Sequence, residues 1–110
     1  MSKSFDFNTI KPITMTVTLS DEEKTTLLVM TPDKKLMGEL MAFRNIQDNV
    51  NDDGTLDALY ELTGKLLSRN KNGITITAKK LKSLYPDITY IVAFLRAYTD
   101  FVKEVIDSKN

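Results

Sequence analysis

The sequence predicts a single α+β domain over residues 1–110, in which an N-terminal β-hairpin precedes about four α-helices and the C-terminal helix is the longest. Three patterns support this prediction: period-two alternation near the N-terminus, helical spacing of apolar residues after residue 30, and a long apolar stretch near the C-terminus. A length of 110 residues fits one domain with a modest core. No repeat or low-complexity tract divides the chain.

The hairpin is predicted over residues 13–30, after an irregular lead-in at residues 1–12. In its first strand every second position is apolar and threonines fill the positions between: Ile13, Met15, Val17 and Leu19. The polar cluster at 20–23 predicts a turn, and the β-rich run at 25–30 predicts a second strand. An isolated hairpin is only marginally stable, so one of its faces has to pack against the helices.

Residues 31–110 form the helical part of the predicted fold. Thr31 and Pro32 predict the start of the first helix, because threonine caps helices and proline fits the first helical position. The polar segment at 49–54 predicts a loop, and the second helix runs from there to the polar segment at 68–73. Both helices repeat apolar residues at helical spacing, which favours burial of one side of each.

The C-terminal part is predicted to contain a short helix and a long one. Thr77 is a suitable N-cap for the short helix, and Pro86 prevents that helix from continuing beyond Leu84. Asp87 then caps the long helix, which extends to about Ile106. This last helix is the most informative segment, because apolar residues cover most of its circumference.

Two apolar stripes run along the last helix. The first stripe contains Ile88, Ile91, Val92, Leu95, Tyr98, Val102, Val105 and Ile106. The second stripe contains Tyr90, Phe94, Ala97 and Phe101. Together they span an arc of about 220°, whereas an arc of about 100° is typical of a surface helix.

Two interpretations of the double stripe stay open. Either the helix is the central element of the core and both stripes are covered, or one stripe is covered and the other receives a partner or a second copy of the chain. On the second interpretation, the partner-binding side chains are those of the second stripe and two methionines of the first helix, because methionine adapts to varied partners. These residues are Tyr90, Phe94, Ala97, Phe101, Met37 and Met41.

The composition argues against catalysis. Fifteen basic and fifteen acidic residues cancel, so no overall field indicates nucleic acid or a membrane as partner. Without His and Cys, the chain lacks the commonest general base, the thiolate nucleophile and the usual transition-metal ligands. We therefore expect a non-enzymatic protein without a cofactor or a metal. The polar N-terminus and the lack of a long apolar run predict a soluble, intracellular chain.

Three motif-like segments have simpler structural explanations. The segment at 49–54 resembles a calcium loop, but Tyr60 stands where such a loop needs a bidentate glutamate. Residues 76–96, with a basic stretch at 65–82, resemble a helix-turn-helix, but the would-be recognition helix begins with core-type residues. The acidic stretch at 48–61 lies in and after a loop, where we expect solvated carboxylates, or carboxylates paired with the basic stretch or a partner, rather than a catalytic pair.

Four segments after the hairpin follow one another in a recognisable order. They are residues 35–43 (KLMGELMAF), the acidic loop at 48–54, residues 56–62 (LDALYEL) and residues 72–76 (NGITI), before the short helix and the apolar terminal helix. From Pro32 onward, this order resembles tail assembly chaperones encoded by siphophages of Gram-positive hosts. The hairpin matches that family only in general type.

The resemblance implies a protein that acts in the host cytoplasm during virion assembly and is absent from the mature virion. Members of that family bind the long, helical, apolar tape-measure protein, keep it soluble and help to recruit tail-tube subunits around it. A programmed frameshift often produces a longer second product, and the end at Lys109-Asn110 is compatible with an A-rich slippery site. The family has no catalytic residues to transfer.

Two other functions remain as alternatives at this point. The basic stretch at 65–82 is compatible with a small nucleic-acid-binding regulator, which would retain generic DNA at low salt. A virion component, such as a tail completion or connector protein, would be found in purified particles. Membrane binding is not expected, because no segment is apolar over the length of a bilayer.

Overall fold

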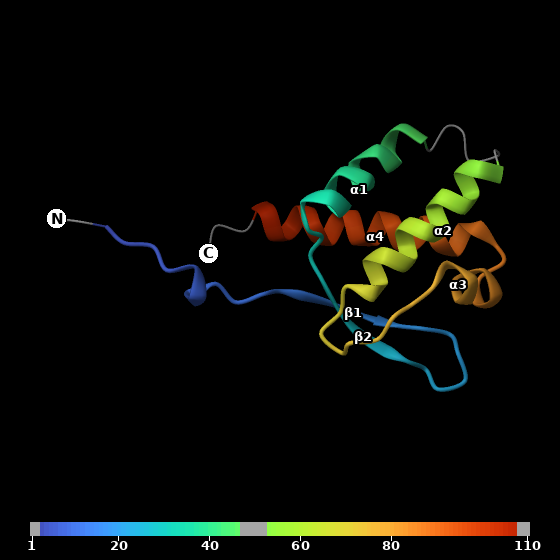
Figure 1. The fold of residues 1–110 in the computed structure, drawn as a ribbon, viewed down its shortest axis with the longest axis horizontal. Helices are drawn as coiled ribbons and strands as arrows, with labels where there is room; N and C mark the ends of the chain where they lie inside the picture. Colours follow the sequence, from blue (N-terminus) through green and yellow to red (C-terminus); the bar gives the residue numbers. More distant parts are fainter. Residues whose placement is uncertain (1–2, 47–52, 108–110) are drawn as a thin grey trace.

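In the computed structural model, which describes residues 3–46 and 53–107, a two-stranded antiparallel hairpin precedes four α-helices (Figure 1). In chain order the elements are the 3-10 helix η1 (Phe7–Thr9), β1 (Thr14–Thr18), β2 (Thr26–Met30), α1 (Lys34–Ile46), α2 (Asp53–Ser68), α3 (Ala78–Leu84) and α4 (Ile88–Asp107). The predicted α+β order is confirmed, and α4 is the longest helix at 20 residues.

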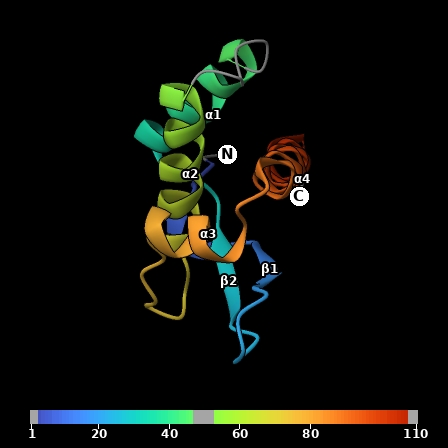
Figure 2. The ribbon, with the colours of Figure 1, turned by 90° about the vertical axis from the view of Figure 1, so that its right-hand side faces the viewer.

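The helix α2 lies at the centre of the arrangement, because it contacts α1, α3, α4 and β2. Figure 2 shows α1 and α2 on one side, α4 on the other side, and the hairpin below them. The chain before β1 projects away from this body, which contributes to the elongated extents of 58 × 34 × 18 Å (Figure 1). Within the described residues, no helix combines the length and the apolar character that crossing a membrane requires.

The caps of α3 and α4 are as predicted, whereas the start of α1 is not. Thr77 accepts a hydrogen bond from the backbone N–H of Lys80 at 3.1 Å, and Asp87 accepts one from the backbone N–H of Thr89 at 2.9 Å. The first helix begins at Lys34 rather than at Pro32, because the carboxylate of Asp33 is its N-cap. An aspartate there is favoured both as an acceptor and by its charge at the positive end of the helix dipole.

Thr31, the predicted cap of the first helix, takes part in a different contact, and the predicted lead-in contains a short helical turn. Thr31 belongs to the connection between β2 and α1, where its carbonyl accepts a hydrogen bond from Nε of Arg69 at 2.7 Å. The lead-in contains one short helical turn, η1, which Asp6 caps through the backbone N–H of Asn8 at 2.9 Å. The predicted loop at 49–54 lies mostly outside the described residues, and α2 begins at Asp53.

The polar segment after α2 fastens β2 to the helices. The buried side chain of Asn70 donates two hydrogen bonds, to the carbonyls of Leu67 and Ile74, both at 2.7 Å. Its Oδ1 accepts the backbone N–H groups of Asn72 at 3.0 Å and of Ile74 at 3.1 Å. Gly73 takes a positive φ of 69°, which glycine adopts without strain. The predicted helix stop at 68–73 is therefore confirmed, and the side chain of Asn70 holds the turn together.

The core lies where α4 crosses α2 and the inner face of the hairpin. The hairpin contributes Leu27 and Val29, which are fully buried, and α4 contributes Leu95 and Tyr98, which are also fully buried. The hydroxyl of Tyr98 donates a hydrogen bond to the carbonyl of Met30 at 2.8 Å. Burial of this ring raises the pKa of its hydroxyl, which stays protonated and available as a donor.

Gly64 marks the closest approach between α2 and the segment that leads into α3. A Cβ at this position would lie 3.0 Å from the carbonyl oxygen of Ile76 and 3.3 Å from the backbone nitrogen of Ala78. Backbone atoms cannot rotate away as the end of a side chain can, so a methyl group there would push the two segments apart. Gly38 in α1 differs, because a Cβ there would meet nothing within 4 Å.

We expect Gly64→Ala to destabilise the fold by about 1–3 kcal/mol despite the better helix propensity of alanine. The matched change Gly38→Ala should stabilise the fold by about 0.5–1 kcal/mol, because alanine restricts the unfolded chain and meets no neighbour. Urea unfolding of both variants measures the difference. An equal gain in the free energy of unfolding of both variants would show that α2 and the 76–78 segment can move apart without loss of stability.

Candidate binding surfaces on helix α4

The first stripe of α4 lies in the core along its middle. Its buried residues are Ile91, Leu95, Tyr98 and Val102. Towards the end of the helix the cover is incomplete, since the side chain of Ile106 is 66% exposed. One side of α4 is therefore occupied by the fold itself.

The second stripe lies beside the core and is only partly covered. Tyr90 is 61% exposed and Ala97 is exposed, whereas Phe94 and Phe101 are half-buried. The rings of Phe94 and Phe101 flank the ring of Tyr98, at centroid distances of 5.7 and 5.8 Å. The core thus holds the inner edges of these two rings in place, and the stripe forms a rigid, partly exposed aromatic surface.

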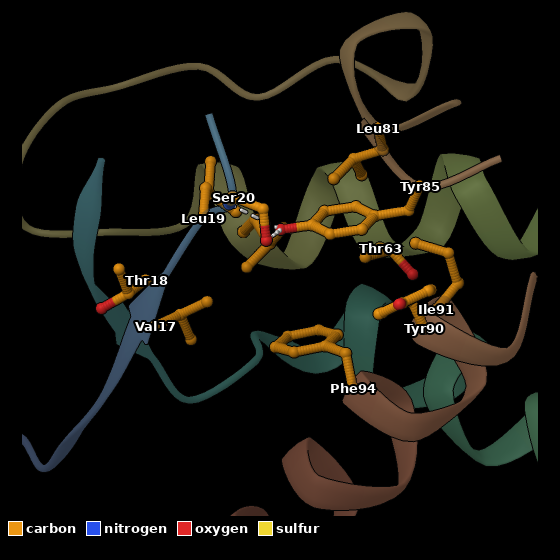
Figure 3. Close-up of a pocket in the computed structure, with 11 residues that line it drawn as sticks. Val17, Thr18, Leu19, Ser20, Thr63, Leu81, Tyr85, Tyr90, Ile91 and Phe94 are labelled. Atoms are coloured by element: carbon orange, nitrogen blue, oxygen red, sulfur yellow. Dashed lines mark hydrogen bonds between the residues drawn. The ribbon is translucent and has the colours of Figure 1, made fainter. Parts of the chain in front are cut away.

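A pocket of about 240 Å³ lies between the end of β1, α3 and the first turns of α4 (Figure 3). Its lining includes Val17 and Leu19 from the first strand and its end, Tyr85 after α3, and Tyr90 and Phe94 from the second stripe. In Figure 3 the side chain of Val17 lies on the same side of this pocket as the ring of Phe94. The volume is below the roughly 300 Å³ at which small-molecule sites begin, so the pocket suits a protein side chain better than a cofactor.

Tyr85 closes one end of this pocket, and sequence reasoning did not identify it. Its hydroxyl accepts a hydrogen bond from the backbone N–H of Ser20 at 2.9 Å and donates one to the hydroxyl of Ser20 at 3.1 Å. Its carbonyl accepts a hydrogen bond from the hydroxyl of Tyr60 at 2.5 Å, and its ring lies 5.5 Å from that of Tyr90. These partners are distant in the sequence, and no local pattern pairs them.

A second apolar hollow, of about 210 Å³, lies between α1 and the C-terminal half of α4. It is lined by Met37, Leu40, Met41, Thr99, Val102, Lys103 and Ile106. Met41 is 64% exposed, so a flexible thioether side chain stands at the rim of this hollow. We refer to it as the α1–α4 groove.

The six predicted partner-binding residues therefore fall on two surfaces instead of one. Ala97 of the second stripe and Thr99 of the α1–α4 groove are two positions apart, which places them about 160–200° apart around the helix. Tyr90 and Phe94 line the pocket beside β1, and helical spacing places Ala97 and Phe101 on the same side of α4. The two methionines, on α1, line the groove on the opposite side of α4.

The basic stretch at 65–82 is largely engaged by the protein itself. Three of its lysines pair with carboxylates: Lys65 with Glu39 at 3.1 Å, Lys80 with Asp21 at 3.3 Å, and Lys82 with Asp57 at 2.9 Å. The hydrogen bond to Asp57 is the main cause that raises the pKa of Lys82. The pair Lys82–Asp57 joins the predicted basic and acidic stretches, as expected for segments that neutralise each other.

The acidic stretch forms no cluster of potential metal ligands in the described part of the chain. No group of three or more potential metal ligands occurs among the described residues. Asp48 and Asp52 lie outside those residues. The chain as a whole matches no family model, no curated protein and no solved structure.

Asp21 stabilises the hairpin turn next to the pocket. Its carboxylate accepts hydrogen bonds from the hydroxyl of Thr25 at 2.6 Å and from the backbone N–H of Thr25 at 2.8 Å, and Lys80 lies 3.3 Å away. These bonds, with the Thr25 hydroxyl contributing most, lower the pKa of Asp21 from 3.8 to about 2. Because the folded state prefers the ionised form, its contribution to stability is present above about pH 4 and disappears as the pH falls towards 2.

We expect Asp21→Asn to reduce the loss of stability between about pH 4 and pH 2, because the variant has no carboxylate to protonate. At neutral pH the same variant should be less stable than the wild type. Urea unfolding at several pH values measures both effects. Glu22→Gln, in the same turn, is the matched control and should retain the wild-type acid profile. A wild-type acid profile in Asp21→Asn would show that protonation of Asp21 does not contribute to the loss of stability in acid.

Proposed function

We propose that this chain is a non-enzymatic tail assembly chaperone of a tailed phage, which binds and solubilises the tape-measure protein in the host cytoplasm and helps to recruit tail-tube subunits. One observation carries the proposal: the two flanks of α4 retain apolar surface that the fold does not cover. Tyr90, Met41 and Ile106 are 61%, 64% and 66% exposed, respectively. The order of segments after Pro32, which resembles that family, supports the same assignment.

The two flanks suit an apolar helix as client. Burial of a large side chain contributes about 1.5–3 kcal/mol, so a few such contacts give useful but reversible affinity. A helix that lies in a groove repeats its anchors every three or four residues, and both the second stripe and the α1–α4 groove run along α4 with that spacing. The methionines on one flank adapt their shape, as promiscuous binding requires.

The polar face of α4 explains how such a surface stays in solution. Between the two apolar flanks lie exposed charged residues of both signs: Arg96, Asp100, Lys103 and Asp107. Mixed charges interrupt the apolar area and keep any one patch small, which limits aggregation. A protein that holds apolar segments of another protein needs this combination.

We expect Tyr90→Ser and Met41→Ser each to weaken capture of the tape-measure protein about tenfold, because each removes about 1.5 kcal/mol of apolar contact. Both side chains are mostly exposed, so the melting temperature of the free chain should change little. The measurement is the soluble amount of the tape-measure protein from the same phage when it is co-expressed with each variant, together with its affinity for the purified chain.

The matched control is Leu28→Ser, which removes an exposed apolar side chain from the hairpin, away from both flanks of α4. It should capture the tape-measure protein like the wild type. Wild-type capture by both α4 variants would show that neither flank is the client site. A wild-type chain that never solubilises the tape-measure protein, or that occurs in purified virions, would contradict the chaperone role itself.

A further inference from the structure

The N-terminal arm, defined as residues 3–13, is exposed throughout and projects from the body of the fold (Figure 1). It carries four of the eight large apolar side chains that are exposed among the described residues. They are Phe5 (67%), Phe7 (79%), Ile10 (57%) and Ile13 (49%). Such a concentration of apolar side chains on a projecting segment, whose one helical turn is η1, indicates a surface that a partner covers.

Strand β1 presents a free edge. Leu19 donates its backbone N–H to the carbonyl of Thr25, and the register pairs Val17 with Leu27, so the odd-numbered residues direct their backbone groups towards β2. Thr14, Thr16 and Thr18 therefore direct their N–H and C=O groups away from β2. Within the described part of the chain, no strand pairs with β1 on that side.

Backbone groups on the outer edge of β2 and just beyond the end of β1 already have hydrogen-bond partners. The free edge of β1 differs from them in this respect. On the outer edge of β2, Met30 and Leu28 bond to the backbone of Arg69 and Lys71. Beyond the end of β1, the N–H of Ser20 is bonded to the hydroxyl of Tyr85. Folded proteins rarely leave an open strand edge beside apolar surface, because such an edge recruits another strand.

We propose that the single exposed turn η1 opens and that the N-terminal arm of a second copy of this chain adds to the free edge of β1 as an antiparallel strand. In the register that fits best, Phe5 and Phe7 of the second copy lie opposite Leu19 and Val17, and Asn8 lies opposite Thr16. Leu19 and Val17 line the pocket beneath the second stripe, so both rings face that pocket. Each of the three edge threonines then gains a backbone partner.

Charge supports the same register. Lys3 of the second copy lies opposite Asp21, at the start of the acidic turn that continues with Glu22 and Glu23. Asp21 is already paired with Lys80, so Glu22 and Glu23, which are exposed like Lys3, are the carboxylates available for this pairing. A parallel arrangement would reverse the arm and take Phe5 away from the pocket. Opposite charges at the end of an added strand favour one direction over the other.

A second copy fits this edge better than the arm of the same chain. Within one chain the same register would need a three-residue turn formed by Lys11, Pro12 and Ile13. Such turns place a residue in the left-handed conformation, which a β-branched Ile13 adopts only with strain. The arm instead leaves β1 in the extended direction, as an exchanged segment does (Figure 1).

The test uses two full-length variants with complementary defects. Phe5→Ser combined with Phe7→Ser removes the arm's anchors but keeps the edge. Thr16→Pro removes one N–H from the free edge but keeps the arm, and no hydrogen bond within the hairpin is lost. We expect the wild type to self-associate in sedimentation at micromolar concentration. Each variant alone should sediment as a monomer, and an equimolar mixture of the two should regain dimer.

Two controls and three outcomes decide the matter. Thr26→Pro, on the other strand of the hairpin, and Leu28→Ser, on its outer face, should both self-associate like the wild type. If Thr16→Pro fails to fold, Thr16→Lys replaces it in the mixture. A monomeric wild type overturns the proposal. So does self-association of the arm variant alone, because the edges would then pair with each other, and so does a mixture that stays monomeric. The inference does not depend on the proposed function, since no client takes part in this test.

Discussion

Burial of the first stripe of α4 against α2 and the inner face of the hairpin is the interaction on which the other features depend. Leu95 and Tyr98 are fully buried there, and the hydroxyl of Tyr98 fixes the position of the helix through its bond to Met30. Once this side is fixed, a rotation of 100° per residue determines where every other side chain of α4 points. The second stripe then lies above the edge of β1, and the α1–α4 groove lies on the far flank.

The polar contacts around the hairpin are asymmetric, and this asymmetry shapes the surface. Asn70 and its neighbours satisfy the outer edge of β2, and Tyr85 satisfies the end of β1 at Ser20. Each of these contacts removes a backbone donor that would otherwise be available to a partner. The three threonines of β1 direct their backbone groups to a side on which no strand pairs with β1 within the described chain, and the aromatic pocket lies beside them. The unpaired edge of β1 and the second stripe of α4 therefore border the same pocket.

Local patterns were sufficient for the elements but not for the surfaces. The alternation in residues 13–19 predicted β1, and single capping side chains at Thr77 and Asp87 predicted two helix starts correctly. The start of α1 was wrong because Thr31 and Asp33 are both good caps, and only tertiary contacts select between them. The double stripe was visible in the sequence, but its separation from the methionines was not. The flank that each element covers depends on packing between segments that are distant in the chain.

On the proposed function, the two flanks of α4 differ in how a second copy of the chain affects their access to a client. An arm from a second copy occupies the β1 edge and the pocket near Tyr90, whereas the α1–α4 groove around Met41 stays open. Strand addition relies on backbone hydrogen bonds and needs a defined register, which suits pairing between identical chains. An adaptable methionine-lined groove needs no register, which suits a long apolar client with many similar segments. On the proposed function, self-association would shield the more rigid aromatic flank until a client displaces the arm, and the adaptable flank would stay open throughout.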